Sequence, residues 1–145
     1  MYTFIRTTLL EGIELFAKQE EVVLTEADTN IVLQREGIIG YYIYKGPQKI
    51  GFMLLLKKTE KDYFLWSYII DKKFQNLGHG TNALKEFLKL LKDKFDVERV
   101  RLCYELGNNV AQHIYDKVGF CEVDRRDFEG EDGKEHHEIN MSIYL

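Results

Sequence analysis

The sequence is poor in cysteine and proline, and it has no long uncharged stretch. Its two cysteines, Cys103 and Cys121, have neither CxxC spacing nor the density of a disulfide scaffold, which predicts free thiols in a reducing compartment. The longest uncharged apolar runs, residues 37–44 and 63–70, are far shorter than the roughly 20 residues that cross a bilayer. We therefore expect a cytoplasmic protein that has no membrane partner.

An excess of basic charge is also absent, because 20 Lys and Arg residues stand against 24 Asp and Glu residues, for a net charge of −4. Nucleic acid attracts proteins with a basic surface, so it is not an expected partner. What the sequence does have is an apolar content of 45% over 145 residues, enough for one hydrophobic core. These values predict a single domain over residues 1–145.

The first half of the chain changes from a helical to a strand pattern. Within residues 8–22, apolar side chains recur at the spacing of one buried helical stripe, which predicts an amphipathic helix. Residues 25–30 are polar and fit either a capped short helix or a loop. Residues 38–44, 49–57 and 63–70 are rich in β-branched, aromatic and aliphatic side chains and are separated by turn residues. We expect an antiparallel meander, its third strand buried on both faces.

The second half alternates helices and strands. From Gly80 onward apolar residues recur with helical period over about four turns, and residues 97–105 alternate as a strand does. A second helix is expected from Asn108 to Gly119, followed by strands over residues 120–128 and 138–145. The whole pattern predicts an α/β (α+β) fold.

The strongest local signal lies between the third strand and the first of these helices. This segment has two glycines, which allow a tight turn and expose backbone N–H groups at the positive end of a helix dipole. Such a loop can hold a pyrophosphate, although an ordinary Gly-rich turn has the same composition. Its residues are Gln75, Asn76, Leu77, Gly78, His79 and Gly80, and Thr81 follows in the helix.

A dinucleotide-binding reading of the same glycines is less favourable. Gly78-x-Gly80-x-x-Ala83 satisfies the fingerprint of a Rossmann unit. That fold requires further parallel crossovers, whereas only about 40 residues follow Glu105 and they read as an antiparallel pair. We therefore prefer a different phosphate-binding fold.

Two ordered motifs indicate which fold this is. Gln75-x-x-Gly78-x-Gly80 resembles the acetyl-CoA pyrophosphate loop of GNAT acetyltransferases. Downstream, Asn108-x-x-Ala111-x-x-x-Tyr115-x-x-x-Gly119-Phe120 resembles the next part of that signature at the expected distance. The resemblance covers residues 38–145. It implies a mixed, mainly antiparallel sheet flanked by helices, with acetyl-CoA bound where the sheet splays.

The resemblance assigns expected roles around acetyl-CoA as cosubstrate. Backbone groups of Tyr68, Ile69 and Ile70 would hold the pantetheine and the thioester carbonyl, as an oxyanion hole does. The phosphate loop and the start of its helix would bind the pyrophosphate, and Asn108 and Ala111 would lie against the cofactor. Asn108 can equally be explained as a helix cap.

Tyr115 matches the tyrosine that protonates the departing CoA sulfur in this family. A phenol with a pKa of about 10 stays protonated near neutral pH and can donate to a developing thiolate. Without the flanking motif, a core aromatic would be the simpler interpretation of Tyr115. With the motif, we expect a general acid.

The base that deprotonates the amine is not fixed by a motif. Residues 63–70 contain no carboxylate, so Glu105 or an ordered water chain is the expected base. His79 lies in the phosphate loop, where we expect its side chain to point to solvent. His136 and His137 are neighbours on a strand and should face opposite sides, so no metal site is expected.

The acceptor is expected to be a small amine. The C-terminal half has a weaker similarity to bacterial spermine and spermidine acetyltransferases, which favours a polyamine. Carboxylates for a polyamine occur in two sets, although a solvated acidic face explains them as well. The two sets are Glu11, Glu14, Glu20 and Glu21, and Glu129, Glu131, Asp132 and Glu135.

Other amines and a different class of protein stay open at this stage. Protein N-termini, lysine side chains and aminoglycosides suit the same fold. A non-catalytic acetyl-CoA sensor or regulatory interaction protein is the alternative class. The family resemblance also suggests a homodimer formed through the C-terminal strand.

Overall fold

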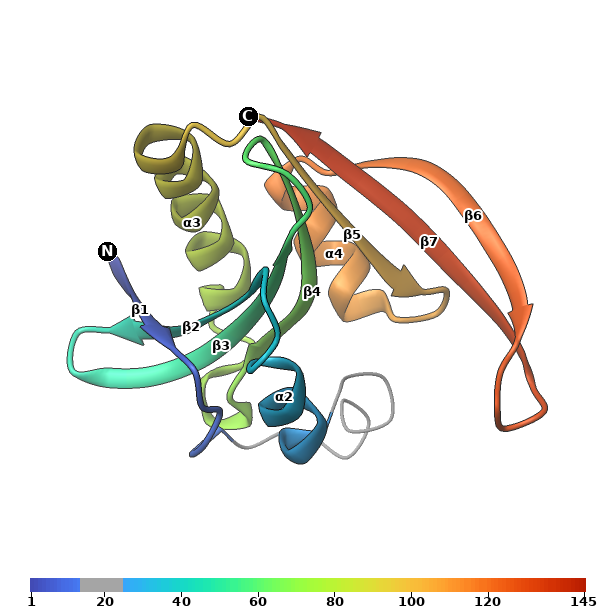
Figure 1. Cartoon of the computed structure of the whole chain (residues 1–145), viewed down its shortest axis with the longest axis horizontal. Helices are drawn as coiled ribbons and strands as arrows, with labels where there is room; N and C mark the ends of the chain where they lie inside the picture. The colour runs from blue at the N-terminus through green and yellow to red at the C-terminus, as the bar shows by residue number, and fades with distance from the viewer. Residues whose placement is uncertain (14–24) are drawn as a thin grey trace.

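One seven-stranded sheet organises the molecule in the computed structural model, which describes residues 1–13 and 25–145 (Figure 1). Its strand order is β1-β2-β3-β4-β5-β7-β6. Among these neighbours only β4 and β5 run parallel. The strands are β1 (Tyr2–Thr7), β2 (Ile38–Lys45), β3 (Gln48–Lys57), β4 (Asp62–Ile70), β5 (Arg99–Glu105), β6 (Cys121–Glu129) and β7 (Glu135–Tyr144). The mixed, mainly antiparallel sheet confirms the predicted fold class.

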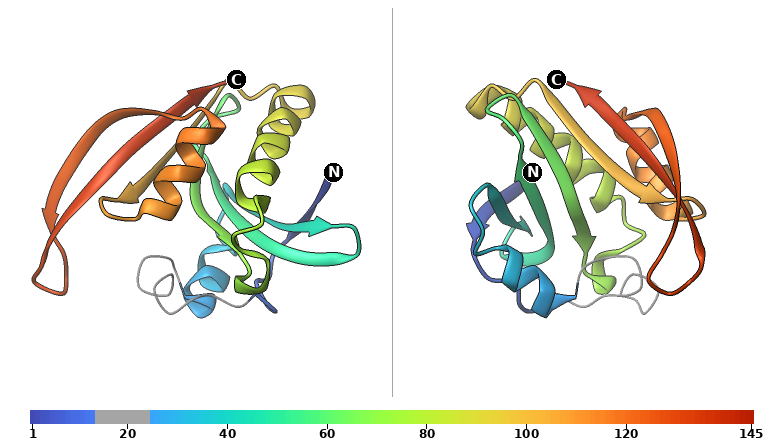
Figure 2. Two further views of the ribbon diagram at one scale, coloured as in Figure 1. Left: turned by 180° about the vertical axis from the view of Figure 1, so that it is seen from behind. Right: turned by 45° about the vertical axis from the view of Figure 1, so that its right-hand side comes forward.

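Helices cover both faces of the sheet. α3 (His79–Phe95) and α4 (Asn109–Val118) pack on one face, whereas α2 (Glu26–Val32) lies on the other (Figure 2). A short 3₁₀ turn, η1 (Lys72–Phe74), precedes α3. Within residues 1–13 and 25–145, no helix is both long and apolar enough to cross a membrane.

The N-terminal prediction needs correction. Residues 8–13 are not helical, and residues 14–24 lie outside the described part of the chain. The main chain of residues 8–13 is instead tied to its neighbours: Leu10 N donates to Asn30 Oδ1 at 2.7 Å, and Glu11 N donates to the Tyr42 hydroxyl at 3.0 Å. The polar stretch after this segment forms α2, where the Thr25 hydroxyl accepts from Asp28 N and caps the helix.

The predicted meander is confirmed, with one correction in its third strand. Residues 38–44 and 49–57 pair as the β2–β3 hairpin, and β4 follows antiparallel to β3. β4 is not buried on both faces, because Trp66 is 38% exposed at a bulge and Phe64 is half-buried. The prediction was wrong because β4 has aromatic and aliphatic side chains on both faces, a pattern typical of a fully buried strand, whereas one of its faces is only partly covered.

Two apolar clusters fill the two faces of the sheet. The larger lies under α3 and α4, with Phe87 fully buried against the rings of Phe4 and Tyr41 at centroid distances of 5.0 and 5.2 Å. The smaller lies under α2 and includes Leu54 and Ile69. These clusters identify the side of the sheet to which each strand residue points.

The feature that positions the functional site is the end of the parallel pairing. β4 and β5 are paired from Asp62↔Arg99 to Leu65↔Leu102 and no further. A bulge in the β3–β4 ladder lies at the same level, between Leu54 and Leu55. Beyond these residues the two strands diverge, as the right-hand view of Figure 2 shows. We call this opening the fork.

Candidate active site

The β4 side of the fork has an unused backbone edge. Tyr68, Ile69 and Ile70 remain paired with β3 through Met53, Phe52 and Gly51, but they have no partner in β5. Apart from the Ile70 carbonyl, which accepts from the Gln75 side chain, backbone groups along this edge are therefore available to a ligand that lies beside the strand. These are the three residues that the family resemblance expects to hold the pantetheine, and the structure places them on the unpaired edge of β4.

The predicted phosphate loop connects β4 to α3. Asp71 caps η1 by accepting from Lys73 N at 3.0 Å, and the Gln75 side-chain amide donates to the Ile70 carbonyl at 2.7 Å. Gln75 thus ties the loop to the end of β4. Gly78 has a φ of 83°, a left-handed conformation that glycine adopts without strain.

The first turn of α3 is suited to an anion. Gly78 precedes the helix without a side-chain cap, and the first turn carries no acidic residue. His79, Gly80 and Thr81 therefore present backbone N–H groups at the positive end of the helix dipole. Asn76 and Leu77 lie exposed just before them. The arrangement fits a pyrophosphate group.

Gly80 serves close packing between α3 and α4. A Cβ added to Gly80 would lie 2.8 Å from Cδ1 of Ile114. Because the end of the half-buried Ile114 side chain can move and Ala is the better helix former, we expect Gly80→Ala to change the free energy of unfolding by less than about 1 kcal/mol. Ile114→Ala should relieve the collision, so the double variant should be more stable than the sum of the single effects predicts. Urea unfolding of the four proteins measures this coupling, and additive effects would contradict it.

His79 does not point to solvent as predicted. Its Nδ1 lies 2.8 Å from the Tyr2 hydroxyl, and the two rings meet edge to face at 5.8 Å. The sequence prediction was wrong because it did not include β1, whose first residue supplies this partner. His79 joins the N-terminal strand to the start of α3.

α4 begins and ends as its motif predicts. The Asn108 side chain accepts from Ala111 N at 3.2 Å, and Gly119 ends the helix in a left-handed conformation at φ 114°. Asn108 was expected either to bind the cofactor or to cap the helix, and the structure shows the cap.

Tyr115 extends from α4 toward the fork. Its ring is buried between Tyr104 and Phe120, with centroid distances of 6.1 and 5.8 Å. It belongs to the apolar cluster that also contains Tyr68 on β4 and Tyr104 on β5, the two strands that separate here. Burial raises the pKa of Tyr115 well above that of an ordinary phenol, with a smaller contribution from Cys103. Its hydroxyl therefore stays protonated at neutral pH.

Glu105 ends β5 on the other side of the fork. Its neighbour Tyr104 packs against the cluster under α3 and α4, so Glu105 points to the opposite face of the sheet. The Glu105 carboxylate contacts Nδ1 of His136 on β7. Tyr115 and Glu105 thus approach the fork from its two faces.

Ser67 is a site residue that the sequence analysis missed. It is 5% exposed, and its hydroxyl has no hydrogen-bond partner among the described residues. Its partner in the ladder, Leu54, belongs to the cluster under α2, which places Ser67 on the same face as Glu105. A buried hydroxyl without a partner costs about 1–3 kcal/mol, which a bound polar ligand would offset. No motif marks this serine.

The paired histidines face opposite ways, as predicted. His136 contacts Glu105, whereas Nδ1 of His137 lies 2.6 Å from Asp127. Asp127, Glu135 and His137 bring possible donor atoms within 4.8 Å of one another at an exposed position. The His137–Asp127 hydrogen bond accounts for this grouping, and we propose no metal site there.

Comparison with known proteins identifies the family. Residues 7–120 match the profile of the acetyltransferase (GNAT) family. An N-alpha-acetyltransferase from Sulfurisphaera tokodaii is 27% identical over 86 residues, which are 59% of this chain and 52% of that protein. The chain therefore spans about half the length of that relative.

Solved structures share this fold. Spermidine N-acetyltransferase from Vibrio cholerae, in complex with CoA and spermine, superposes with a TM-score of 0.69 at 18% identity, covering 79% of this chain and 70% of that one. A GNAT-family acetyltransferase from Streptococcus pneumoniae has a TM-score of 0.64 at 21% identity, covering 84% and 78%. With the profile spanning most of the sequence, this chain belongs to the acetyltransferase (GNAT) family.

Proposed function

We propose that this chain transfers the acetyl group of acetyl-CoA to a primary amine. The observation that carries the proposal is the position of Tyr115, which packs in one cluster with Tyr68 of β4 and Tyr104 of β5 and whose pKa is raised by burial. Tyr68 connects this point to the phosphate loop, because its hydroxyl donates to the Gly80 carbonyl at 2.7 Å. The hydroxyl of Tyr115 would thus lie between the proposed thioester position and the N-terminal end of α3.

Acetyl-CoA would lie along the fork. Its pyrophosphate would accept hydrogen bonds from the backbone of the loop and of the first turn of α3, since that turn has no cap of its own. Its pantetheine would follow the unpaired edge of β4 at Tyr68, Ile69 and Ile70. An N–H on that edge could hold the thioester carbonyl and stabilise the developing oxyanion.

Direct transfer requires a proton at the leaving group. The amine nitrogen attacks the carbonyl carbon, the carbon–sulfur bond breaks, and the departing sulfur takes the hydroxyl proton of Tyr115. Burial that raises the pKa of Tyr115 also disfavours a charged thiolate beside its ring, which favours protonation of the departing sulfur. The phenolate regains its proton from solvent or from the proton that the amine releases.

The amine must lose a proton before it attacks. A primary amine has a pKa of about 10, so only about one molecule in a thousand is neutral near pH 7. Glu105 is the proposed acceptor of this proton, directly or through water, because it lies at the fork on the face opposite to Tyr115. Ser67 on the same face supplies a hydroxyl for the incoming amine or a bridging water.

A polyamine such as spermidine or spermine is the favoured acceptor. The loop between β6 and β7 and its flanks carry exposed carboxylates, and several carboxylates near one another suit a chain with several ammonium groups. These residues are Glu129, Glu131, Asp132 and Glu135. The structural neighbour from Vibrio cholerae is a spermidine N-acetyltransferase solved with spermine, whereas the archaeal relative is an N-alpha-acetyltransferase. Peptide N-terminal amines are therefore the second class to test.

The test is turnover with a panel of acceptors. Purified protein is incubated with acetyl-CoA and spermidine, spermine, lysine peptides, peptides with free N-termini or aminoglycosides. Free CoA thiol and the mass of the acceptor are measured together. We expect thiol release with an added acetyl group on a polyamine. Acetylation of a peptide N-terminus would replace the polyamine assignment, and no product with any amine would contradict the proposed activity.

A further inference from the structure

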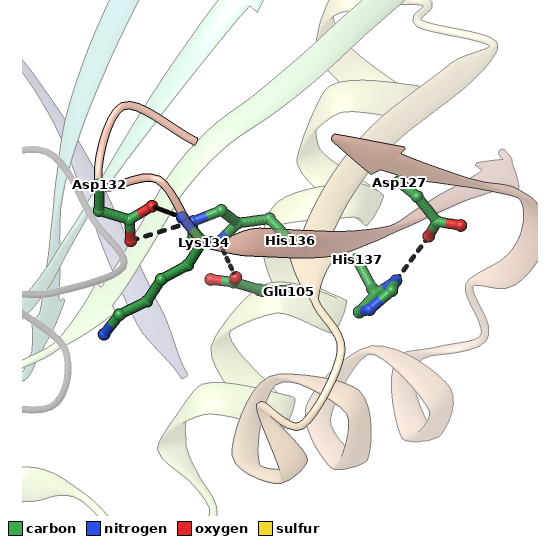
Figure 3. Close-up of polar contacts among 6 residues, drawn as sticks. All are labelled: Glu105, Asp127, Asp132, Lys134, His136 and His137. Atoms are coloured by element: carbon green, nitrogen blue, oxygen red, sulfur yellow. Dashed lines mark hydrogen bonds and ion pairs between the residues drawn. The ribbon is translucent and has the colours of Figure 1, made fainter. Parts of the chain in front are cut away.

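The tip of the β6–β7 hairpin is built around His136. Its Nδ1 contacts the Glu105 carboxylate at the end of β5, and its Nε2 lies 3.0 and 3.1 Å from the two carboxylate oxygens of Asp132 in the loop (Figure 3). One imidazole therefore joins two carboxylates from segments that are far apart in the sequence. Both of its nitrogens are used.

This geometry requires a protonated ring. Ionised carboxylates only accept hydrogen bonds, and a neutral imidazole has a single N–H to donate. Donation to Glu105 and to Asp132 at the same time therefore needs the imidazolium. In agreement, the hydrogen bonds to Asp132 and then to Glu105 raise the pKa of His136 above its ordinary value.

The loop between β6 and β7 packs closely around the His136 ring. The His136 ring stacks on Phe128 with centroids 5.3 Å apart and planes 18° from parallel. A Cβ on Gly130 would lie 2.5 Å from Nε2 of His136 and 2.8 Å from Oδ1 of Asp132, so a larger residue there would have to displace this pair. Gly130 N also donates to the Lys134 carbonyl at 2.9 Å and closes the loop. The imidazole is held from three sides.

We propose that His136 is a positioning residue for the acceptor end of the fork: its imidazolium ties the Glu105 carboxylate to Asp132, so that the loop closes against the end of β5 only while His136 is protonated. The inference rests on the proposed function, in which Glu105 receives the proton of the amine. The β6–β7 loop thereby lines the acceptor site when His136 is protonated and is released from β5 when His136 is neutral.

Other charged groups also lie around His136. On β7, Glu138 shares its face and interacts with Cys103 on β5. On β6, Arg126 lies opposite Glu138 in the ladder. In the loop, Lys134 interacts with Asp132 and weakens its negative field. None of them contacts a ring nitrogen. Asp132 and Glu105 therefore have the largest influence on the protonation of His136.

The sign of the pH effect follows from the raised pKa. The bridge is fully formed below the ordinary histidine pKa of about 6.5, and it is lost as pH rises through the higher folded value. The acceptor should therefore bind less well above that value, while the binding of acetyl-CoA, which would follow the edge of β4, should be unaffected. This is the expected signature of the proposal.

The test compares His136→Gln with His137→Gln. His137 is a matched control, because it is the next residue on the same strand, pairs with a carboxylate and faces the other way (Figure 3). At pH 6 we expect His136→Gln to raise the acceptor KM about tenfold with an unchanged acetyl-CoA KM, and His137→Gln to have no effect. At pH values above the pKa of His136, the acceptor KM of the wild type should rise toward that of His136→Gln. Equal acceptor KM values for the two variants at pH 6 would overturn the proposal.

A second readout needs no turnover. The imidazole pKa of His136 is measured by NMR titration in the wild type, Glu105→Gln and Asp132→Asn. We expect a decrease toward 6.5 in each variant and no change at His137. An unchanged His136 titration would overturn the bridge even if the wild type is active. Conversely, a wild type without turnover contradicts the proposed function, whereas the titration still decides whether the bridge exists.

Discussion

Tyr115→Phe should reduce kcat about 10²- to 10³-fold while acetyl-CoA binds as before. The substitution removes only the hydroxyl that protonates the departing sulfur, and general acid catalysis typically contributes that much. The buried ring keeps its contacts with Tyr104 and Phe120, so stability should be nearly unchanged. Steady-state kinetics with calorimetric titration of acetyl-CoA measure both quantities.

The pH dependence of this variant gives a further check. Because burial raises the pKa of Tyr115 well above 10, the hydroxyl should stay protonated between about pH 6 and 9. The deficit of Tyr115→Phe should therefore be the same across that range. Wild-type kcat in the variant would remove Tyr115 from the mechanism. A wild type that binds acetyl-CoA without turnover would favour a sensor.

Glu105→Gln should reduce kcat/KM for the amine about 10²- to 10³-fold at pH 7. The amide keeps the size of the side chain but cannot accept the proton of the attacking ammonium. The loss should shrink as pH rises toward the amine pKa of about 10, because more of the acceptor is then already neutral. Initial rates at saturating acetyl-CoA between pH 7 and 9.5 measure this trend.

The matched control is Glu138→Gln. Glu138 lies opposite Glu105 in the β5–β7 ladder and on the same face of the sheet, so it tests whether negative charge alone accounts for the effect. We expect less than a threefold change, as is common for a partly exposed charge outside the site. Equal losses in both variants would contradict a specific role of Glu105 and indicate a general acidic field.

Local patterns were enough to predict the elements that hold the site. The hairpin over residues 38–57, the helix after Gly80 and the capped helix from Asn108 to Gly119 follow from side-chain period and from cap and turn residues. Each of these signals arises within a few residues of the element itself. The role expected of Tyr115 rests instead on the resemblance of the α4 motif to the GNAT signature, and it stays a prediction.

Contacts between distant segments were not predictable in this way. β1 was missed because a six-residue strand at the sheet edge has little internal signal apart from its aromatic and β-branched residues. The exposure of Trp66 depends on where β4 and β5 stop pairing. The same holds for the Ser67 hydroxyl, which has no hydrogen-bond partner among the described residues. The His136 bridge joins residues 31 positions apart, a separation that no periodicity encodes.

The central claim is that the fork between β4 and β5 holds acetyl-CoA, and NMR mapping of backbone amides during titration with acetyl-CoA tests it most directly. The account predicts saturable shifts at residues 68–70 and 77–81, with the amides of β6 little changed. An absence of shifts at the fork and in the loop, or shifts confined to other elements, would contradict it.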